Sequence, residues 1–347
     1  MRHSGSHRRT AIAAAAALVC AVGGTSHAQS LTESTPYLAD QRVNGAFSLG
    51  TLDERGGAFG RQQGRLGFGT DVHNPSSLWL RTSGGAFNAD LDRSLGLARP
   101  ATLVQTGADV ASWSLLGSGD RVRLGAMAGQ SRASADLLGL GNPVQADGRA
   151  IGTSVGAYAT WFQNDRSRLG WYADSWGQYN SYRSAANGPL PAGGDYRGSD
   201  SLLSLETGYT LRLADGLDWR VTPQGQVVYA RNNQGASLAG PSASGLTGDD
   251  GWIGRVGVRL TSPAAEAGAW RFQPYAAVNW WHDGLNGTTL LDPATGRGFY
   301  PSERYEVKTG LEVLFGPKWS AWGSLGMQWG DQSYKNWSAG IGLRYAM

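Results

Sequence analysis

The chain has 347 residues, of which 41% are hydrophobic and only 16% are charged, and it contains 52 glycines. Glycine therefore makes up about 15% of the chain against a usual share of roughly 7%, and the charged share falls well below the roughly 25% of a typical soluble domain. This composition excludes a disordered chain and an ordinary cytosolic enzyme. After the first thirty residues there are never 18 consecutive apolar positions, which excludes a protein that crosses membranes with helices. A large all-β protein remains.

The first 28 residues have the organisation of a secretory signal peptide. Three arginines precede an apolar run over 11–22, and small residues stand at the two positions within 26–28 that a signal peptidase reads. We predict cleavage between Ala28 and Gln29. This cleavage removes three of the 30 basic residues and no acid, so 27 basic residues match 27 acidic ones and the charge does not indicate nucleic-acid binding. Cys20 leaves with the signal, so the exported protein needs neither disulfides nor metal thiolates.

Residues 29–76 form a short leader that is too small for a domain with its own core. Within 37–55, apolar and polar side chains recur in a loose helical pattern that two glycines interrupt. Such a helix would be marginal in isolation. It would suit a polar lumen, where its small residues would let it pass between inward-pointing side chains.

From residue 77 onward the chain reads as a series of alternating strands. The clearest strand places Leu203, Leu205 and Tyr209 on one face and Ser204 and Glu206 on the other, because side chains project with period two along a strand. A soluble β-sandwich alternates in the same way. Two features favour a transmembrane barrel: the polar faces are rich in Gly, Arg, Glu and Gln, and segments of about 9 to 11 residues cross a bilayer when tilted.

Tryptophan positions support the membrane interpretation. The segments 270–281 and 319–329 both carry Trp near their two ends, where the interfacial girdles of a membrane barrel hold aromatic rings.

The number of predicted strands is twelve, an even number as in bacterial outer-membrane barrels. They cover residues 77–86, 101–115, 121–130, 150–162, 168–182, 201–213, 218–230, 251–261, 269–281, 303–315, 319–329 and 334–346. The connections alternate between short turns at 116–120, 163–167, 214–217, 262–268 and 316–318 and long loops at 131–149, 183–200, 231–250 and 282–302. Outer-membrane barrels have short turns on the periplasmic side and long loops on the outer side. The same arrangement here would place the start of the first strand and the end of the last strand on the periplasmic side.

Several motifs in a shared order and spacing carry a family resemblance. They are Leu49–Arg55 (LGTLDER), Leu78–Arg81 (LWLR), Gly170–Asp174 (GWYAD), Ser204–Tyr209 (SLETGY), Gln224–Tyr229 (QGQVVY), Phe272–Tyr275 (FQPY), Asn279–His282 (NWWH) and Trp337–Tyr345 (WSAGIGLRY). On these motifs the chain resembles the translocator domain of pertactin-type autotransporters, from about residue 37 to residue 347.

The resemblance implies an all-β fold, a twelve-stranded antiparallel transmembrane β-barrel with an N-terminal lumen helix, in the outer membrane of a Gram-negative cell. The domain order would be a signal peptide over 1–28, a leader over 29–76 with a pore helix at about 37–55, and a barrel over 77–347. In the family this barrel enables an N-terminal passenger to reach the cell surface by type V secretion. By position, the expected pore-helix residues are Leu38, Arg42, Phe47, Leu49, Leu52 and Arg55.

A closed barrel would turn a set of charged side chains of both signs into its lumen. These are Arg81, Asp109, Arg123, Glu206, Arg212, Arg255, Arg259, Lys308 and Glu312. Mixed signs suit a polar plug better than a selective ion pore. The alternative is that these groups only pair with one another across the lumen.

The resemblance also implies partners: outer-membrane lipid and lipopolysaccharide, and the barrel assembly machinery with periplasmic chaperones during biogenesis. The expected C-terminal assembly signal is Ile341, Leu343, Tyr345 and Met347, although the family usually ends on an aromatic residue. Only about ten mature residues precede Tyr37, so the passenger is expected to be vestigial or absent. We expect a monomer with no cofactor, metal or nucleic acid. The lumen helix has Asn44 without a paired asparagine, so self-cleavage there is not expected.

Two other classes of function stay open. A channel or surface adhesin would use the long loops, whose Gly, Ser and Asn residues can either bind or merely solvate. An outer-membrane hydrolase would need a base near a nucleophile. Only His73 and His282 follow the signal peptide, and neither lies in a recognised catalytic motif. We therefore expect no enzyme.

Overall fold

The computed structural model describes residues 50–56, 77–92, 95–117, 119–139, 144–187, 195–214, 217–234, 250–284, 290–292, 297–298, 301–331 and 333–347. The predicted signal cleavage between Ala28 and Gln29 lies outside these ranges, as do the expected pore-helix residues Leu38, Arg42, Phe47 and Leu49. Within the same ranges, no helix combines the length and hydrophobicity that crossing a membrane requires.

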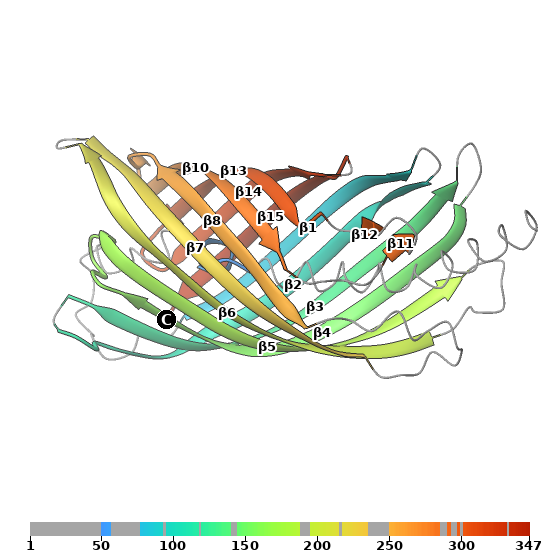
Figure 1. Ribbon diagram of the computed structural model, residues 1–347. Helices are drawn as coiled ribbons and strands as arrows, with labels where there is room; N and C mark the ends of the chain where they lie inside the picture. The colour runs from blue at the N-terminus through green and yellow to red at the C-terminus, as the bar shows by residue number, and fades with distance from the viewer. Residues whose placement is uncertain are drawn as a thin grey trace, which may run out of the picture.

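Twelve antiparallel strands of the described chain close into one barrel (Figure 1). They are β1 (Ser77–Asp92), β2 (Leu95–Trp113), β3 (Arg121–Gly139), β4 (Val144–Phe162), β5 (Gly170–Asn187), β6 (Asp195–Ala214), β7 (Leu217–Gln234), β8 (Gly251–Thr261), β10 (Trp270–Asp283), β13 (Glu303–Phe315), β14 (Trp319–Gly330) and β15 (Lys335–Ala346). The first and last strands pair in register from Ser77↔Ala346 to Asn88↔Lys335, which closes the barrel.

Three short strands add to this architecture. Strand β9 (Ala265–Ala267) pairs with the start of β10 in the β8–β10 connection. Strands β11 (Leu290–Asp292) and β12 (Arg297–Gly298) form a separate two-stranded sheet. The C-terminus lies at the short-turn end of the barrel, where Ala346 N donates to Lys318 O at 2.8 Å.

The predicted fold class and the twelve barrel strands are confirmed, but the strands of the first half are longer than predicted. Strand β6, for example, has 20 residues. The predicted loop 131–149 is mostly strand, since β3 continues to Gly139 and pairs with β4 down to Asp136↔Asp147 and beyond. These extensions are rich in Gly, Ser and Asp. The strands remain hydrogen-bonded to each other there, but apolar and polar residues do not alternate, so the sequence pattern does not predict a strand.

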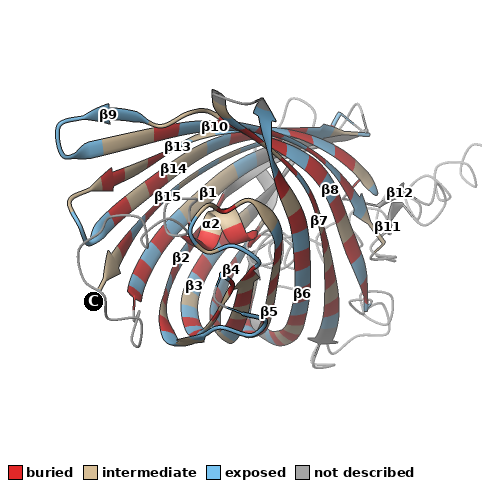
Figure 2. Ribbon diagram, turned by 90° about the vertical axis from the view of Figure 1, so that its left-hand side faces the viewer, coloured by how far each residue is buried: buried red, intermediate tan, exposed pale blue. Residues whose placement is uncertain are grey.

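The two faces of the barrel sort side chains in the reverse of a soluble protein (Figure 2). Large apolar side chains such as Leu203, Val256 and Ile341 are exposed on the outside, whereas polar and charged side chains such as Glu206 and Arg255 are buried inside. Figure 2 shows this as alternating bands along each strand. An apolar exterior of this extent requires an apolar surrounding, which a lipid bilayer provides.

Exposed tryptophans mark both edges of the apolar band. Those near the short turns are Trp113, Trp171, Trp219, Trp270 and Trp319, and those toward the other end are Trp252, Trp280, Trp329 and Trp337. Trp319 and Trp329 are ten residues apart on one strand, which is about 33 Å along the strand. At a tilt of about 40° this becomes about 25 Å along the membrane normal, the height of the apolar band in such barrels.

Inside the lumen, aromatic rings lie directly over glycines of the neighbouring strand. Trp322 stands opposite Gly342 in the β14–β15 register, and a Cβ atom on that glycine would be only 2.1 Å from the indole ring. Tyr158 covers Gly125 in the same way. The rings fit only because the glycines have no side chain, so a side chain at these positions would require the rings to move.

Substitution Gly342→Ala should therefore destabilise the barrel, because overpacking of a filled site typically costs about 1–3 kcal/mol. Gly340→Ala is the matched control: it lies on the same strand and face, and a Cβ there would meet its nearest atom at 3.5 Å, an ordinary contact. Urea unfolding of the folded barrels in detergent measures both changes. Equal stability of the two variants would contradict this packing argument.

Candidate functional site

A short helix, α2 (Leu52–Gly56), lies in the lumen of the barrel (Figure 2). Thr51 caps it: Glu54 N donates to Thr51 Oγ1 at 3.3 Å, and Arg55 N donates to Thr51 O at 3.2 Å. The acidic residues Asp53 and Glu54 occupy the first turn, where they complement the positive end of the helix dipole. One turn of helix is not stable alone, so contacts with the barrel wall hold it.

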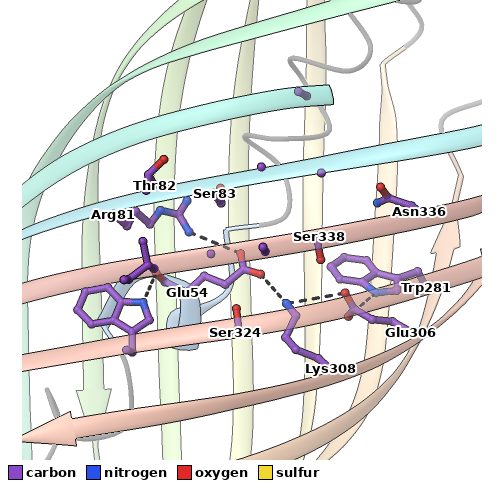
Figure 3. A pocket seen from close by; sticks show the side chains of 17 residues that line it. Glu54, Arg81, Thr82, Ser83, Trp281, Glu306, Lys308, Ser324, Asn336 and Ser338 are labelled. Atoms are coloured by element: carbon purple, nitrogen blue, oxygen red, sulfur yellow. Dashed lines mark hydrogen bonds and ion pairs between the residues drawn. The ribbon is translucent and has the colours of Figure 1, made fainter. Parts of the chain in front are cut away.

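Cationic side chains of the wall form ion pairs with the two acidic side chains of α2, and Figure 3 shows those of Glu54. Lys308 Nζ lies 2.5 Å from Glu54 Oε1, and Arg81 Nη1 lies 3.5 Å from Glu54 Oε2. On another side of the lumen, Arg259 Nη1 lies 2.5 Å from Asp53 Oδ2. These three cations come from β13, β1 and β8, so the anchoring contacts reach α2 from several directions.

The basic side chain of α2, Arg55, pairs with an acidic side chain of the wall. Arg55 forms an ion pair with Asp174 of β5, and both side chains are buried. The guanidinium carbon of Arg55 also lies 4.8 Å from the centre of the Tyr158 ring, within cation–π range. Each charged side chain of α2 is thus paired with an opposite charge on the wall.

Hydrogen bonds to the main chain complete the fit. Trp176 Nε1 donates to Gly50 O at 2.9 Å, and Trp322 Nε1 donates to Glu54 O at 3.1 Å. Leu52 N donates to Glu206 Oε2 at 3.0 Å. The ends of a short helix leave main-chain groups without partners inside the helix, and the wall supplies partners for these three.

A cavity of about 80 Å³ adjoins Glu54 (Figure 3). It runs along β1, β14 and β15, and its lining combines small side chains such as Ser83, Ser324 and Ser338 with large ones such as Trp322. Its size leaves room for a few water molecules. This space beside α2 is therefore small compared with an open pore.

Most of the charged residues predicted to line the lumen lie inside the barrel. Fully buried there are Arg81, Asp109, Glu206, Arg255, Arg259 and Glu312. Arg123 and Lys308 retain slight side-chain exposure. Arg212 differs from the prediction: its side chain is 46% exposed and lies 3.7 Å from Asp218 near the β6–β7 turn. At the end of a strand the alternation no longer points a long side chain into the lumen.

The lumen charges were predicted either to hold a polar plug or only to pair with one another, and the structure shows both kinds of contact. Arg259 Nη2 lies 2.6 Å from Glu312 Oε1, and Arg255 Nη2 lies 3.3 Å from Glu206 Oε2, so wall residues do pair with one another. The same Arg259 and Glu206 also contact α2. Wall-to-wall pairs therefore continue into wall-to-helix pairs.

Sequence reasoning placed Asp53 and Glu54 in the pore helix without giving them a role, and it missed the wall residues Asp174, Trp176 and Trp322 that hold α2. Alternation along β5 could have identified Asp174 and Trp176, because both fall on the face opposite the exposed Trp171. As for metals, the described residues contain no group of three or more His, Cys, Asp or Glu side chains that could hold an ion.

The comparison with known families decides the identity of this barrel. Residues 78–326 match the family model described as the autotransporter beta-domain. The chain belongs to this family. The resemblance found in the sequence is thus confirmed, and the barrel is an outer-membrane translocator barrel of the autotransporter type. The family is one of translocator barrels and not of enzymes.

Individual relatives agree with the family assignment. YdeU of Escherichia coli (strain K12) is 30% identical in an alignment of 291 residues, and the match covers 78% of this chain and 61% of YdeU. The chain spans less than two thirds of the length of the curated relatives that it matches.

Two solved structures share the autotransporter fold. The transport unit of AIDA-I from Escherichia coli superposes with a TM-score of 0.63 at 21% identity, over 80% of this chain and 92% of that one. The β-domain of the Bordetella autotransporter BrkA gives a TM-score of 0.57 at 24% identity, over 79% of this chain and all of that one. At these identities the likeness shows the fold alone.

We predict that Arg55→Met destabilises the folded autotransporter barrel by about 3–5 kcal/mol, because it leaves the carboxylate of Asp174 buried without its cation. The double variant Arg55→Met with Asp174→Leu should recover most of this loss, since it removes both charges. Urea unfolding in detergent measures the free energies of unfolding. A single variant as stable as the parent would show that this pair does not hold α2 in the lumen.

Proposed function

We propose that this barrel delivers the polypeptide that precedes α2 to the cell surface, and that α2 itself remains in the lumen as a plug. The observation that carries this proposal is the complete charge matching between α2 and the wall. A segment without a specific position in the lumen would not have each of its three charges paired with an opposite charge of the wall.

The connectivity supports the direction of delivery. Strand β1 begins at Ser77 beside the C-terminal end of β15, at the short-turn end of the barrel. The chain lies in the lumen at α2 and is at the short-turn rim at Ser77, so it would run toward the periplasm after α2. The residues before Gly50 would leave through the opposite, long-loop end, which in an outer-membrane barrel faces the outside.

The remaining sequence predictions are part of the proposal. The signal peptide would be cleaved between Ala28 and Gln29, leaving a leader over 29–76 and a barrel over 77–347. The residues Ile341, Leu343, Tyr345 and Met347 would serve as the assembly signal read by the barrel assembly machinery, with periplasmic chaperones on the way. The barrel would work as a monomer in contact with lipopolysaccharide, without enzymatic activity and without cleaving its own helix.

Surface labelling tests delivery. An epitope inserted after Ser30 in the full chain should bind its antibody on intact Gram-negative cells. The matched control carries the same epitope in the short turn at Pro317 and should bind only after the outer membrane is permeabilised. Heat-modifiable mobility on gels confirms that each barrel is folded. A protected epitope after Ser30 on cells with a folded barrel would overturn the proposal.

A further inference from the structure

The turn between β2 and β3 carries exposed apolar side chains beyond the aromatic girdle. Leu115 is 62% exposed and Leu116 is 75% exposed, and only Ser114 separates them from the girdle residue Trp113 along the chain. Turns that extend into water are expected to be polar, as the Gly-Pro-Lys turn at 316–318 is. Two adjacent exposed leucines in a turn therefore indicate an apolar surrounding.

The turn folds over the outer face of the barrel. Val122 belongs to the same face of β3 as Leu124 and Ala126, which are exposed, yet Val122 is only 9% exposed. Trp161 is the partner of Val122 in the β3–β4 register and lies on the same outer face. Its Nε1 donates to Asp120 Oδ2 at 3.0 Å, which holds the turn against this face.

The carboxylate of Asp120 satisfies the main chain of the turn. Leu115 N, Leu116 N and Gly117 N each donate to it at 2.9 Å, and Ser114 Oγ donates at 2.5 Å. A turn can enter a region poor in water only if its main-chain donors have partners within the protein, and these donors have them.

We infer that the β2–β3 turn is a membrane anchor that inserts Leu115 and Leu116 among the phospholipids of the periplasmic leaflet. The apolar surface of the turn continues from the lipid-facing side chains Val110 and Trp113 of β2, so the same bilayer that surrounds the barrel wall covers the turn. Asp120 acts as a positioning residue that fixes the turn in this conformation.

Site-specific fluorescence tests the anchor. In the full chain with Cys20→Ser, the substitution Leu116→Cys provides a single thiol for an environment-sensitive NBD label. The matched control is Arg166→Cys, an exposed position in the neighbouring β4–β5 turn. Both proteins are folded into phosphatidylcholine vesicles with and without phospholipid that carries a doxyl quencher on its acyl chain. Heat-modifiable mobility confirms that both are folded.

The anchor predicts that acyl-chain doxyl quenches the label at 116 several-fold more strongly than the label at 166. Adding Asp120→Ala should reduce the quenching at 116 toward the level at 166. Equal quenching at the two positions, with equal access to aqueous iodide, would overturn the inference. So would a label environment at 116 that depends on the protein-to-lipid ratio, because a second copy of the chain would then cover the turn.

Discussion

The structure depends on one constraint: lipid offers no hydrogen bonds, so every main-chain group that crosses the bilayer needs a partner within the protein. The pairing of β1 with β15 meets this constraint by leaving no free edge. Once the sheet is closed, alternation gives each strand one face toward lipid and one toward the lumen. The apolar exterior and the polar interior both follow from this closure.

A sealed interior changes what charged side chains can do. In the lumen, Arg55, Asp174, Arg259 and Glu312 are buried almost completely, so each charge must be paired or it becomes very costly. Buried ion pairs contribute little net stability, because desolvation offsets their attraction. Their larger effect is on position: a shift of α2 along the lumen would separate several pairs at once. Charge pairing therefore explains how a single helical turn keeps one place in the barrel.

Side-chain alternation made the barrel wall predictable from the sequence. The bounds of β8 and β13 agree with the prediction, because these strands alternate over their whole length. The added parts of β3 and β6 were not predictable, because small and polar residues such as Ser131, Ser199 and Asp200 occur on both of their faces, so hydropathy does not alternate there. The lumen contacts were only partly predictable. Arg259 is recognisable as an inward charge, but its pairing with Asp53 depends on where α2 stops along the barrel axis, which no local pattern specifies.

The central claim is that the segment containing α2 closes the barrel, and conductance in planar lipid bilayers tests it most directly. The full chain should give a low and stable conductance, because α2 occupies the lumen and the cavity beside it holds only a few waters. Deletion of residues 29–56 should give a large, steady increase in conductance, with heat-modifiable mobility showing that the barrel is still folded. A high conductance from the full chain that the deletion leaves unchanged would contradict the account and identify the protein as an open channel.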